Sequence, residues 1–120
     1  MDAMAVKAVE VGRASELSPG QMKRVVVSGR EILIARVGDR YYAADNRCPH
    51  MGGNLSQGTL DGTVVTCPRH GSQFDLSNGN IIRWTTWPSV LVAADQIRSR
   101  KRSLRIYPVT VQEDKIRLTL

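Results

Sequence analysis

The segments Cys48-Pro-His-Met-Gly-Gly-Asn-Leu-Ser-Gln-Gly58 and Cys67-Pro-Arg-His-Gly-Ser-Gln-Phe-Asp75 contain both cysteines and both histidines of the chain. In each segment a cysteine is followed by a proline, and a histidine and a glycine come soon after. Sixteen residues separate His50 from Cys67. Thiolates and imidazoles are common metal ligands, and four unrelated structural residues would rarely form two such similar pairs. We therefore predict that Cys48, His50, Cys67 and His70 form one metal site.

The way in which the ligands are paired indicates the kind of site. A 2Fe–2S cluster can take two histidines in place of two thiolates on one of its irons. Zinc sites also use two cysteines and two histidines, but they usually pair like residues, as Cys-x₂₋₄-Cys and His-x₃₋₅-His. Each pair here mixes one cysteine with one histidine, which favours the cluster over a zinc-stabilised binding module. A nucleophilic cysteine–histidine enzyme is a third interpretation, but it leaves the second pair without a role.

At these residues the chain resembles the Rieske family of 2Fe–2S proteins, whose signature is Cys-x-His, sixteen residues and Cys-x-x-His. The ending Tyr107-Pro-Val-Thr-Val111, with residues 115–120, resembles the last hairpin of the same fold. The resemblance covers residues 6–120 apart from 89–103. It implies one 2Fe–2S cluster per chain, with Cys48 and Cys67 on an inner iron. His50 and His70 would hold the outer iron near the surface, where electrons leave.

The resemblance also implies a function. We expect a one-electron carrier, itself no enzyme, that delivers electrons from a reductase to a terminal oxygenase. A Rieske-like small subunit of a nitrite reductase or of another redox complex is the alternative. Such subunits often lack cluster ligands, whereas this chain has all four.

Several positions beside the ligands depart from the pattern of the membrane-bound respiratory members. Those proteins have a second cysteine in each segment, and the two form a disulfide, but here the places hold Gly53 and Arg69. Ser72 matches a serine that donates a hydrogen bond to a cluster sulfur, while Phe74 replaces a hydroxyl-bearing tyrosine. Donors to the sulfurs raise the reduction potential, so we expect a potential of about −150 to 0 mV. We expect Met51 to cover the cluster and Arg69 to lie exposed beside the outer iron.

The rest of the chain predicts an all-β domain, because short runs of period two alternate with turn signals. We expect a single Rieske domain over residues 1–120: a basal antiparallel barrel or sandwich, about 1–44 and 84–120, with a cluster-binding subdomain, about 45–83, inserted in it. Residues 89–103 are interpreted as a short helix or a basic loop. The predicted strands are Val6–Val11, Met22–Val27, Glu31–Val37, Arg40–Ala44, Thr63–Thr66, Gln73–Leu76, Asn80–Arg83, Arg105–Val111 and Lys115–Leu120. Hairpin turns are predicted at Ser28-Gly29-Arg30, Asn78-Gly79 and Gln112-Glu113-Asp114.

Composition and charge indicate where the protein is located and which kinds of partner it can bind. The 120 residues are 42% hydrophobic and 23% charged, with a formal net charge of +6. No apolar run approaches the ~20 residues that span a bilayer, and no signal-peptide pattern opens the chain, so we expect a cytoplasmic protein without membrane contact. The positive charge favours an acidic redox partner or simple solubility. Nucleic acid is not expected, because aromatics are only 5% and no binding motif occurs.

Overall fold

The computed structural model describes residues 8–50, 52–85 and 101–120, and its regular structure is almost entirely β. Every strand pairing is antiparallel, which confirms the predicted all-β class. Two short 3-10 helices, Ala14–Glu16 and Leu55–Gln57, interrupt the strands. The strands are β1 (Ala8–Arg13), β2 (Met22–Val27), β3 (Arg30–Val37), β4 (Arg40–Asp45), β5 (Thr59–Asp61), β6 (Val64–Thr66), β7 (Gln73–Asp75), β8 (Ile81–Arg83), β9 (Ile106–Tyr107), β10 (Val109–Gln112) and β11 (Lys115–Thr119).

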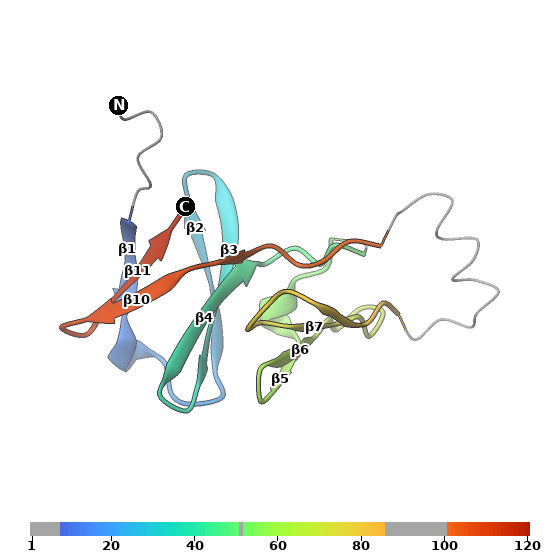
Figure 1. Ribbon diagram of the computed structural model, residues 1–120, viewed down its shortest axis with the longest axis horizontal. Coiled ribbons are helices and arrows are strands. Elements are labelled where there is room, and N and C mark those ends of the chain that lie inside the picture. Colours follow the sequence, from blue (N-terminus) through green and yellow to red (C-terminus); the bar gives the residue numbers. More distant parts are fainter. Residues whose placement is uncertain (1–7, 51, 86–100) are drawn as a thin grey trace.

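The strands form three sheets in the described part of the chain. Two of them, β1-β11-β10 and β2-β3-β4-β9, come from the two ends of the sequence and lie together at one end of the molecule. The third, β5-β6-β7-β8, comes from the middle of the sequence and lies beyond the end of β4 (Figure 1). The first segment that contains a cysteine and a histidine therefore lies between β4 and the third sheet, and the second forms the connection from β6 to β7 within that sheet and β7 itself.

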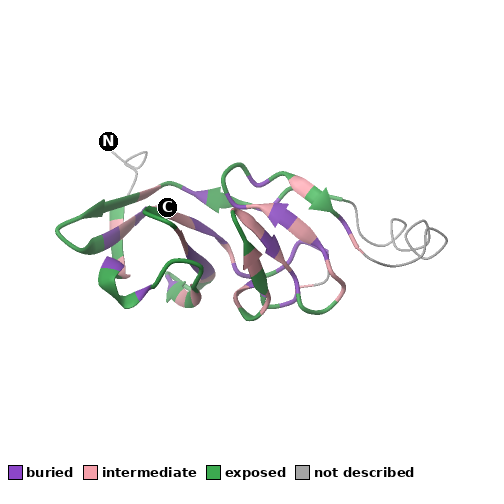
Figure 2. Ribbon diagram, turned by 90° about the horizontal axis from the view of Figure 1, so that it is seen from below, coloured by how far each residue is buried: buried purple, intermediate pink, exposed green. Residues whose placement is uncertain are grey.

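Strand β3 separates two hydrophobic cores. Ile32 and Ile34 pack into the core between the two terminal sheets, while Leu33 and Ala35 pack into the core shared with the third sheet. All four residues are fully buried, and buried positions are found on the strands of both halves (Figure 2). Burial of both faces explains why the sequence of β3 is nearly continuous in apolar residues.

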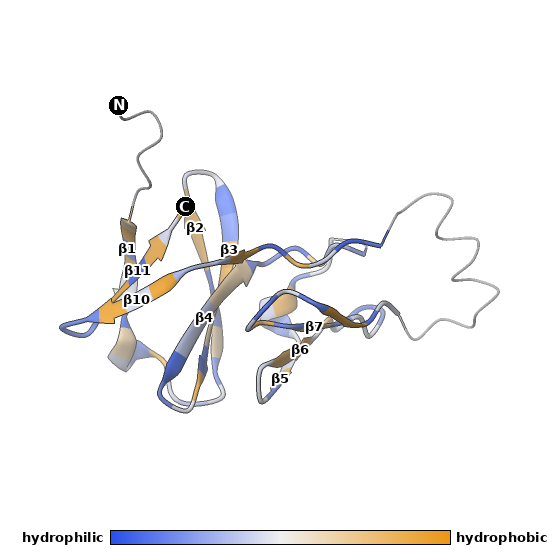
Figure 3. Ribbon diagram, in the orientation of Figure 1, coloured by the Kyte–Doolittle hydropathy of each residue, from blue (hydrophilic) through white to orange (hydrophobic). Residues whose placement is uncertain are grey.

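The predicted turns are found where the sequence places them. Ser28 and Gly29 both have positive φ (51° and 78°) and join β2 to β3 through a two-residue hairpin loop. Glu113 and Asp114 do the same between β10 and β11, with φ of 53° and 66°. Asp114 is held there because its carboxylate accepts hydrogen bonds from the Ser15 backbone N–H (2.8 Å) and hydroxyl (2.7 Å). Figure 3 shows this loop as hydrophilic beside the apolar strands β10 and β11.

Some elements differ from the prediction. The predicted strand over residues 105–111 is divided at Pro108, which has no N–H for a ladder, so that β9 pairs with β4 and β10 pairs with β11. Strand β5 and both 3-10 helices were not predicted. The helix or loop predicted for residues 89–103 lies mostly outside the described residues, and residues 101–103 have no regular structure.

Candidate metal centre

The two segments form loops with the same backbone hydrogen bonds. In tip 1 (residues 48–53) the Cys48 N–H donates to the Gly53 carbonyl (2.8 Å), and the Gly52 N–H donates to the Cys48 carbonyl (2.7 Å). In tip 2 (residues 67–72) Cys67 N–H donates to the Ser72 carbonyl (2.8 Å), and Gly71 N–H donates to the Cys67 carbonyl (3.2 Å). The two tips are therefore structural equivalents, built on a cysteine that is bonded to the fourth and fifth residues after it.

Glycine makes this shape possible in both tips. Gly52 and Gly71 occupy the same place and have nearly the same left-handed φ, 75° and 73°. A residue with a Cβ atom adopts this conformation only at a cost, whereas glycine adopts it freely. The two histidines occupy different places in this common frame, since His50 is the second residue after its cysteine and His70 is the third after its own.

The tips meet at Gly53. A Cβ atom on Gly53 would lie 2.8 Å from the Cys67 Sγ atom and 3.1 Å from the Arg69 Cδ atom. On the same side, the rings of His50 and His70 lie edge to face with centroids 5.3 Å apart. The structure thus brings the two predicted ligand pairs together from segments that are sixteen residues apart. It also places Gly53 against Arg69, the two positions that hold the disulfide cysteines in the respiratory proteins.

The predicted ligands differ in burial. Cys48 and Cys67 are both buried, with 3% of their surface exposed, and neither is in a disulfide. His70 is half-buried, but His50 is buried, at 4% exposed. The side chain of His50 is therefore more enclosed than that of His70. The physical reason is Trp84, whose buried ring packs edge to face on the His50 ring with centroids 5.0 Å apart.

The two residues predicted to tune the cluster are both fully buried. The Ser72 hydroxyl donates a hydrogen bond to the Trp84 carbonyl oxygen. The Phe74 ring packs against the Trp84 ring, with centroids 6.4 Å apart. Both side chains thus position Trp84, and Trp84 in turn covers His50. Met51 lies outside the described residues, and Arg69 is exposed, as predicted.

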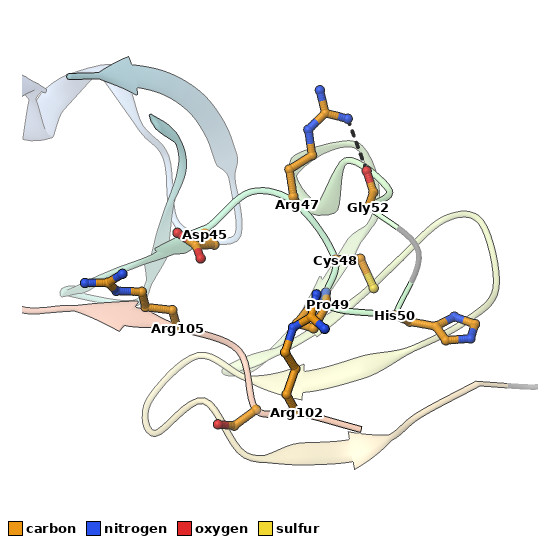
Figure 4. Close-up of a pocket in the computed structure, with 9 residues that line it drawn as sticks. Asp45, Arg47, Cys48, Pro49, His50, Gly52, Arg102 and Arg105 are labelled. Atoms are coloured by element: carbon orange, nitrogen blue, oxygen red, sulfur yellow. Dashed lines mark hydrogen bonds between the residues drawn. The ribbon is translucent and has the colours of Figure 1, made fainter. Parts of the chain in front are cut away.

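Two arginines outside the predicted site hold the equivalent glycines. Arg47 donates from its guanidinium to the Gly52 carbonyl (3.1 Å; Figure 4), and Arg83 donates to the Gly71 carbonyl (3.0 Å). Neither residue belongs to a ligand motif, and Arg83 is twelve residues from its acceptor. No local signal in the sequence could have identified them, because the contacts depend on how the strands bring the segments together.

Tip 1 is also anchored to the terminal sheets. Arg47 Nε lies 2.8 Å from one Glu31 carboxylate oxygen, and Arg24 Nε lies 2.7 Å from the other. Hydrogen bonds from Arg24 and Arg47 hold the pKa of the Glu31 carboxyl below its ordinary value of 4.5. The fully buried Asn46 joins the two ends of the loop, because its amide group donates to the Asn54 side chain (3.0 Å) and its oxygen accepts from the Ser56 N–H (3.0 Å).

The residues at the two tips suit a 2Fe–2S cluster. Two buried thiols and two imidazoles match a cluster with cysteines on one iron and histidines on the other. The absence of a side chain at Gly53 leaves room next to the Cys67 sulfur. Within the described residues, no three His, Cys, Asp or Glu side chains are grouped as they would be around a single metal ion.

Several known proteins similar to this chain are ferredoxins. The chain is 42% identical over 72 residues to ferredoxin CarAc of Metapseudomonas resinovorans, covering 59% of this chain and 67% of that protein. It is 34% identical over 79 residues to the ferredoxin component of a naphthalene 1,2-dioxygenase system of Pseudomonas putida, covering 66% and 76%. In the described part of the chain, no helix has the length and apolar character to cross a membrane.

Solved structures agree with these relatives. A chain in a complex of reduced oxygenase and oxidized ferredoxin of carbazole 1,9a-dioxygenase matches with a TM-score of 0.75 and 31% identity, covering 93% of this chain and 92% of that one. The ferredoxin of carbazole 1,9a-dioxygenase from Nocardioides aromaticivorans IC177 matches with a TM-score of 0.76 and 27% identity, covering 93% and 96%. The family described as Rieske [2Fe-2S] domain matches residues 7–108, so the chain belongs to this family and carries one 2Fe–2S cluster.

Proposed function

We propose that Cys48, His50, Cys67 and His70 are the four ligands of the cluster. The observation that carries this proposal is the equivalence of the two tips, which share one hydrogen-bond frame and bring the histidine rings to 5.3 Å. The two buried thiols, Cys48 and Cys67, would hold the inner iron, and His50 and His70 the outer one. A cluster with two imidazole ligands takes up and releases one electron at a higher potential than an all-cysteine cluster.

The chain's own residues would orient these ligands and control access to them. The hydrogen bonds of Gly52 and Gly71 fix the two loop shapes, and Trp84 closes the side of His50. His70 is the more exposed of the two histidines, so we propose that electrons enter and leave at its edge. The Thr85 hydroxyl donates to the His70 carbonyl (3.2 Å), which helps to hold this residue in place.

We propose that the protein is a one-electron carrier between a reductase and the terminal oxygenase of a multicomponent dioxygenase. The relatives are ferredoxin components of such systems, and one solved match is a ferredoxin bound to an oxygenase. These relatives carry electrons for an enzyme and are not themselves its catalytic component. Neither the nitrite-reductase subunit nor the zinc-stabilised module gains support from them. A cytoplasmic location also fits, because thiol ligands persist in a reducing compartment.

The electron count tests this function directly. Anaerobic titration with dithionite is expected to consume one electron per chain. The reduced chain should then reduce the oxidised oxygenase component of a naphthalene 1,2-dioxygenase system in a stopped-flow experiment, and a Cys48→Ser variant should not. Uptake of two electrons, or of none, by iron-loaded protein would contradict the proposal.

We also propose that residues 45–83 act as an inserted subdomain. Its own sheet, β5-β6-β7-β8, supports this division. Trp84 and Leu104 pack in the core of that sheet, and the Leu104 N–H donates to the Gly79 carbonyl (2.9 Å). The boundary on the C-terminal side therefore includes a few residues beyond 83.

A further inference from the structure

A cleft of about 410 Å³ lies beside tip 1. It runs from the backbone of Pro49 and His50 to the chain that leads into β9, and three arginines line it: Arg47, Arg102 and Arg105. Figure 4 shows the Arg102 side chain extending toward Pro49, with Arg105 on the Asp45 side of the cleft. None of these arginines is a proposed cluster ligand, so their grouping around the cleft indicates a function other than holding the cluster.

The positive charge of the cleft is only partly neutralised. Asp45 is the only acidic residue among the described residues that line it, and its carboxylate already accepts a 2.6 Å hydrogen bond from the Tyr107 hydroxyl. Arg47 is paired with Glu31. Arg102 and Arg105 are both exposed, and neither forms an ion pair with another described residue. These two guanidinium groups therefore provide the uncompensated charge.

The backbone of Arg105 is held in a defined position. Its carbonyl accepts a hydrogen bond from the Asp45 N–H (2.9 Å), at the point where β4 leads into tip 1. Its guanidinium carbon lies 5.4 Å from the centre of the Tyr107 ring, a cation–π contact. A positive group so placed, next to the loop that holds His50, keeps less of its freedom than an ordinary surface arginine.

We propose that this cleft binds a carboxylate side chain of an acidic redox partner and so docks that partner beside tip 1. The proposal rests on the proposed electron-carrier function and deepens it. A guanidinium group pairs with a planar carboxylate through two parallel hydrogen bonds, which gives orientation as well as attraction. Charge complementarity would also speed the encounter, because the whole chain carries a formal net charge of +6.

A protein carboxylate fits the cleft better than nucleic acid. Nucleic-acid surfaces usually add exposed aromatic side chains on which bases stack. Among the described residues no Phe, Trp or Tyr lines the cleft, and the neighbouring Tyr107 is buried, with its hydroxyl bonded to Asp45. The cleft therefore offers charge and shape without a stacking platform.

Small oxidants of opposite charge test the cleft without a known partner. Dithionite-reduced holoprotein passes one electron to hexacyanoferrate(III), giving hexacyanoferrate(II), or to tris(phenanthroline)cobalt(III), giving the cobalt(II) complex. In an Arg102→Gln/Arg105→Gln variant at low salt we expect the reaction with the anion to be about tenfold slower and that with the cation to be faster. An Arg40→Gln/Lys115→Gln variant loses the same charge at exposed positions away from the tips and should change both rates much less.

A competitor identifies the chemistry of the occupant. A blocked peptide of four glutamates should slow the hexacyanoferrate(III) reaction of the wild type and leave the cleft variant unaffected. Equal effects in the cleft and control variants would overturn the proposal, as would no effect of the peptide. Stronger competition by an oligonucleotide of equal charge would overturn it in favour of nucleic acid. Failure of the electron-carrier function is distinguishable, since the protein would then react with neither oxidant.

Discussion

Gly53 is the residue at which the two tips are closest. A methyl group there would lie 2.8 Å from the Cys67 sulfur, and a cysteine side chain is too short to move away freely. We therefore expect Gly53→Ala to lose most of its iron and its brown colour while its far-UV circular dichroism stays close to that of the wild type. Iron and sulfide analysis of the purified variant measures this.

Gly52 provides the matched control. A Cβ atom on Gly52 meets nothing within 4 Å, so Gly52→Ala suffers only from its positive φ, at a cost of about 1 kcal/mol. It should keep its cluster and melt a few degrees lower. If both alanine variants load iron equally well, a collision with the Cys67 sulfur is not the reason why position 53 requires glycine.

A variant of Ser72 shows whether its hydroxyl contributes to stability or to the reduction potential. Its hydroxyl donates to the Trp84 carbonyl, and loss of a buried partner costs about 1–3 kcal/mol. Ser72→Ala should therefore reduce the unfolding free energy by that amount and shift the reduction potential little, as measured by urea denaturation and redox titration. A large fall in potential at unchanged stability would show that the hydroxyl serves a cluster sulfur instead.

The expected reduction potential depends on Phe74, which has no hydroxyl that could donate a hydrogen bond to a cluster sulfur. With Ser72 bonded to Trp84 as well, we keep the expected value of about −150 to 0 mV, in the lower part of the Rieske range. A titration that gives more than about +200 mV would be incompatible with this view of the site.

At the scale of elements, each tip is held to a strand by an arginine. Arg83, from β8, bonds the Gly71 carbonyl and places a positive charge near tip 2. Arg83→Gln should lower the reduction potential by about 10–40 mV, since a partly screened charge contributes up to ~1 kcal/mol. Arg83→Lys keeps the charge and should recover most of the potential. Equal values for wild type and Arg83→Gln would assign the arginine a purely structural role.

The sequence predicted the elements where the information is local. The ligand segments, the hairpins at Ser28-Gly29 and Asn78-Gly79 and the final hairpin all depend on neighbouring residues. The arginine contacts and the shape of the cleft between Arg102 and Arg105 could not be predicted, because they depend on segments brought together from different sheets. The division of the last long strand at Pro108 was predictable in principle, since proline cannot continue a central ladder.

At the scale of the whole molecule, stability should depend on acid pH through Glu31. The pKa of this carboxyl is lowered in the folded state, so its contribution is present above the ordinary value of 4.5 and is lost as the pH falls through the folded value. Glu31→Gln should therefore lose less stability on acidification through and below about pH 4.5, as measured by urea denaturation. Arg24→Gln, which removes one of the partners, should flatten the profile in the same direction. A variant profile that parallels the wild type would contradict this role.

The charge of the molecule persists when the cluster is bound. Two ferric irons and two sulfides carry +2, which the two thiolates cancel, so the oxidised protein keeps about +6 and the reduced protein about +5. A carrier whose charge stays positive in both states should keep its attraction to an acidic partner through the whole cycle and lose it at high salt.

Pulsed EPR on dithionite-reduced protein labelled with ¹⁵N-histidine is the most direct test of whether His50 and His70 are cluster ligands. We predict brown protein with two irons and two sulfides per chain, and nuclear couplings to two histidine nitrogens, which disappear in His50→Cys and His70→Cys one at a time. Colourless protein with one zinc per chain, or a cluster without histidine coupling, would contradict it.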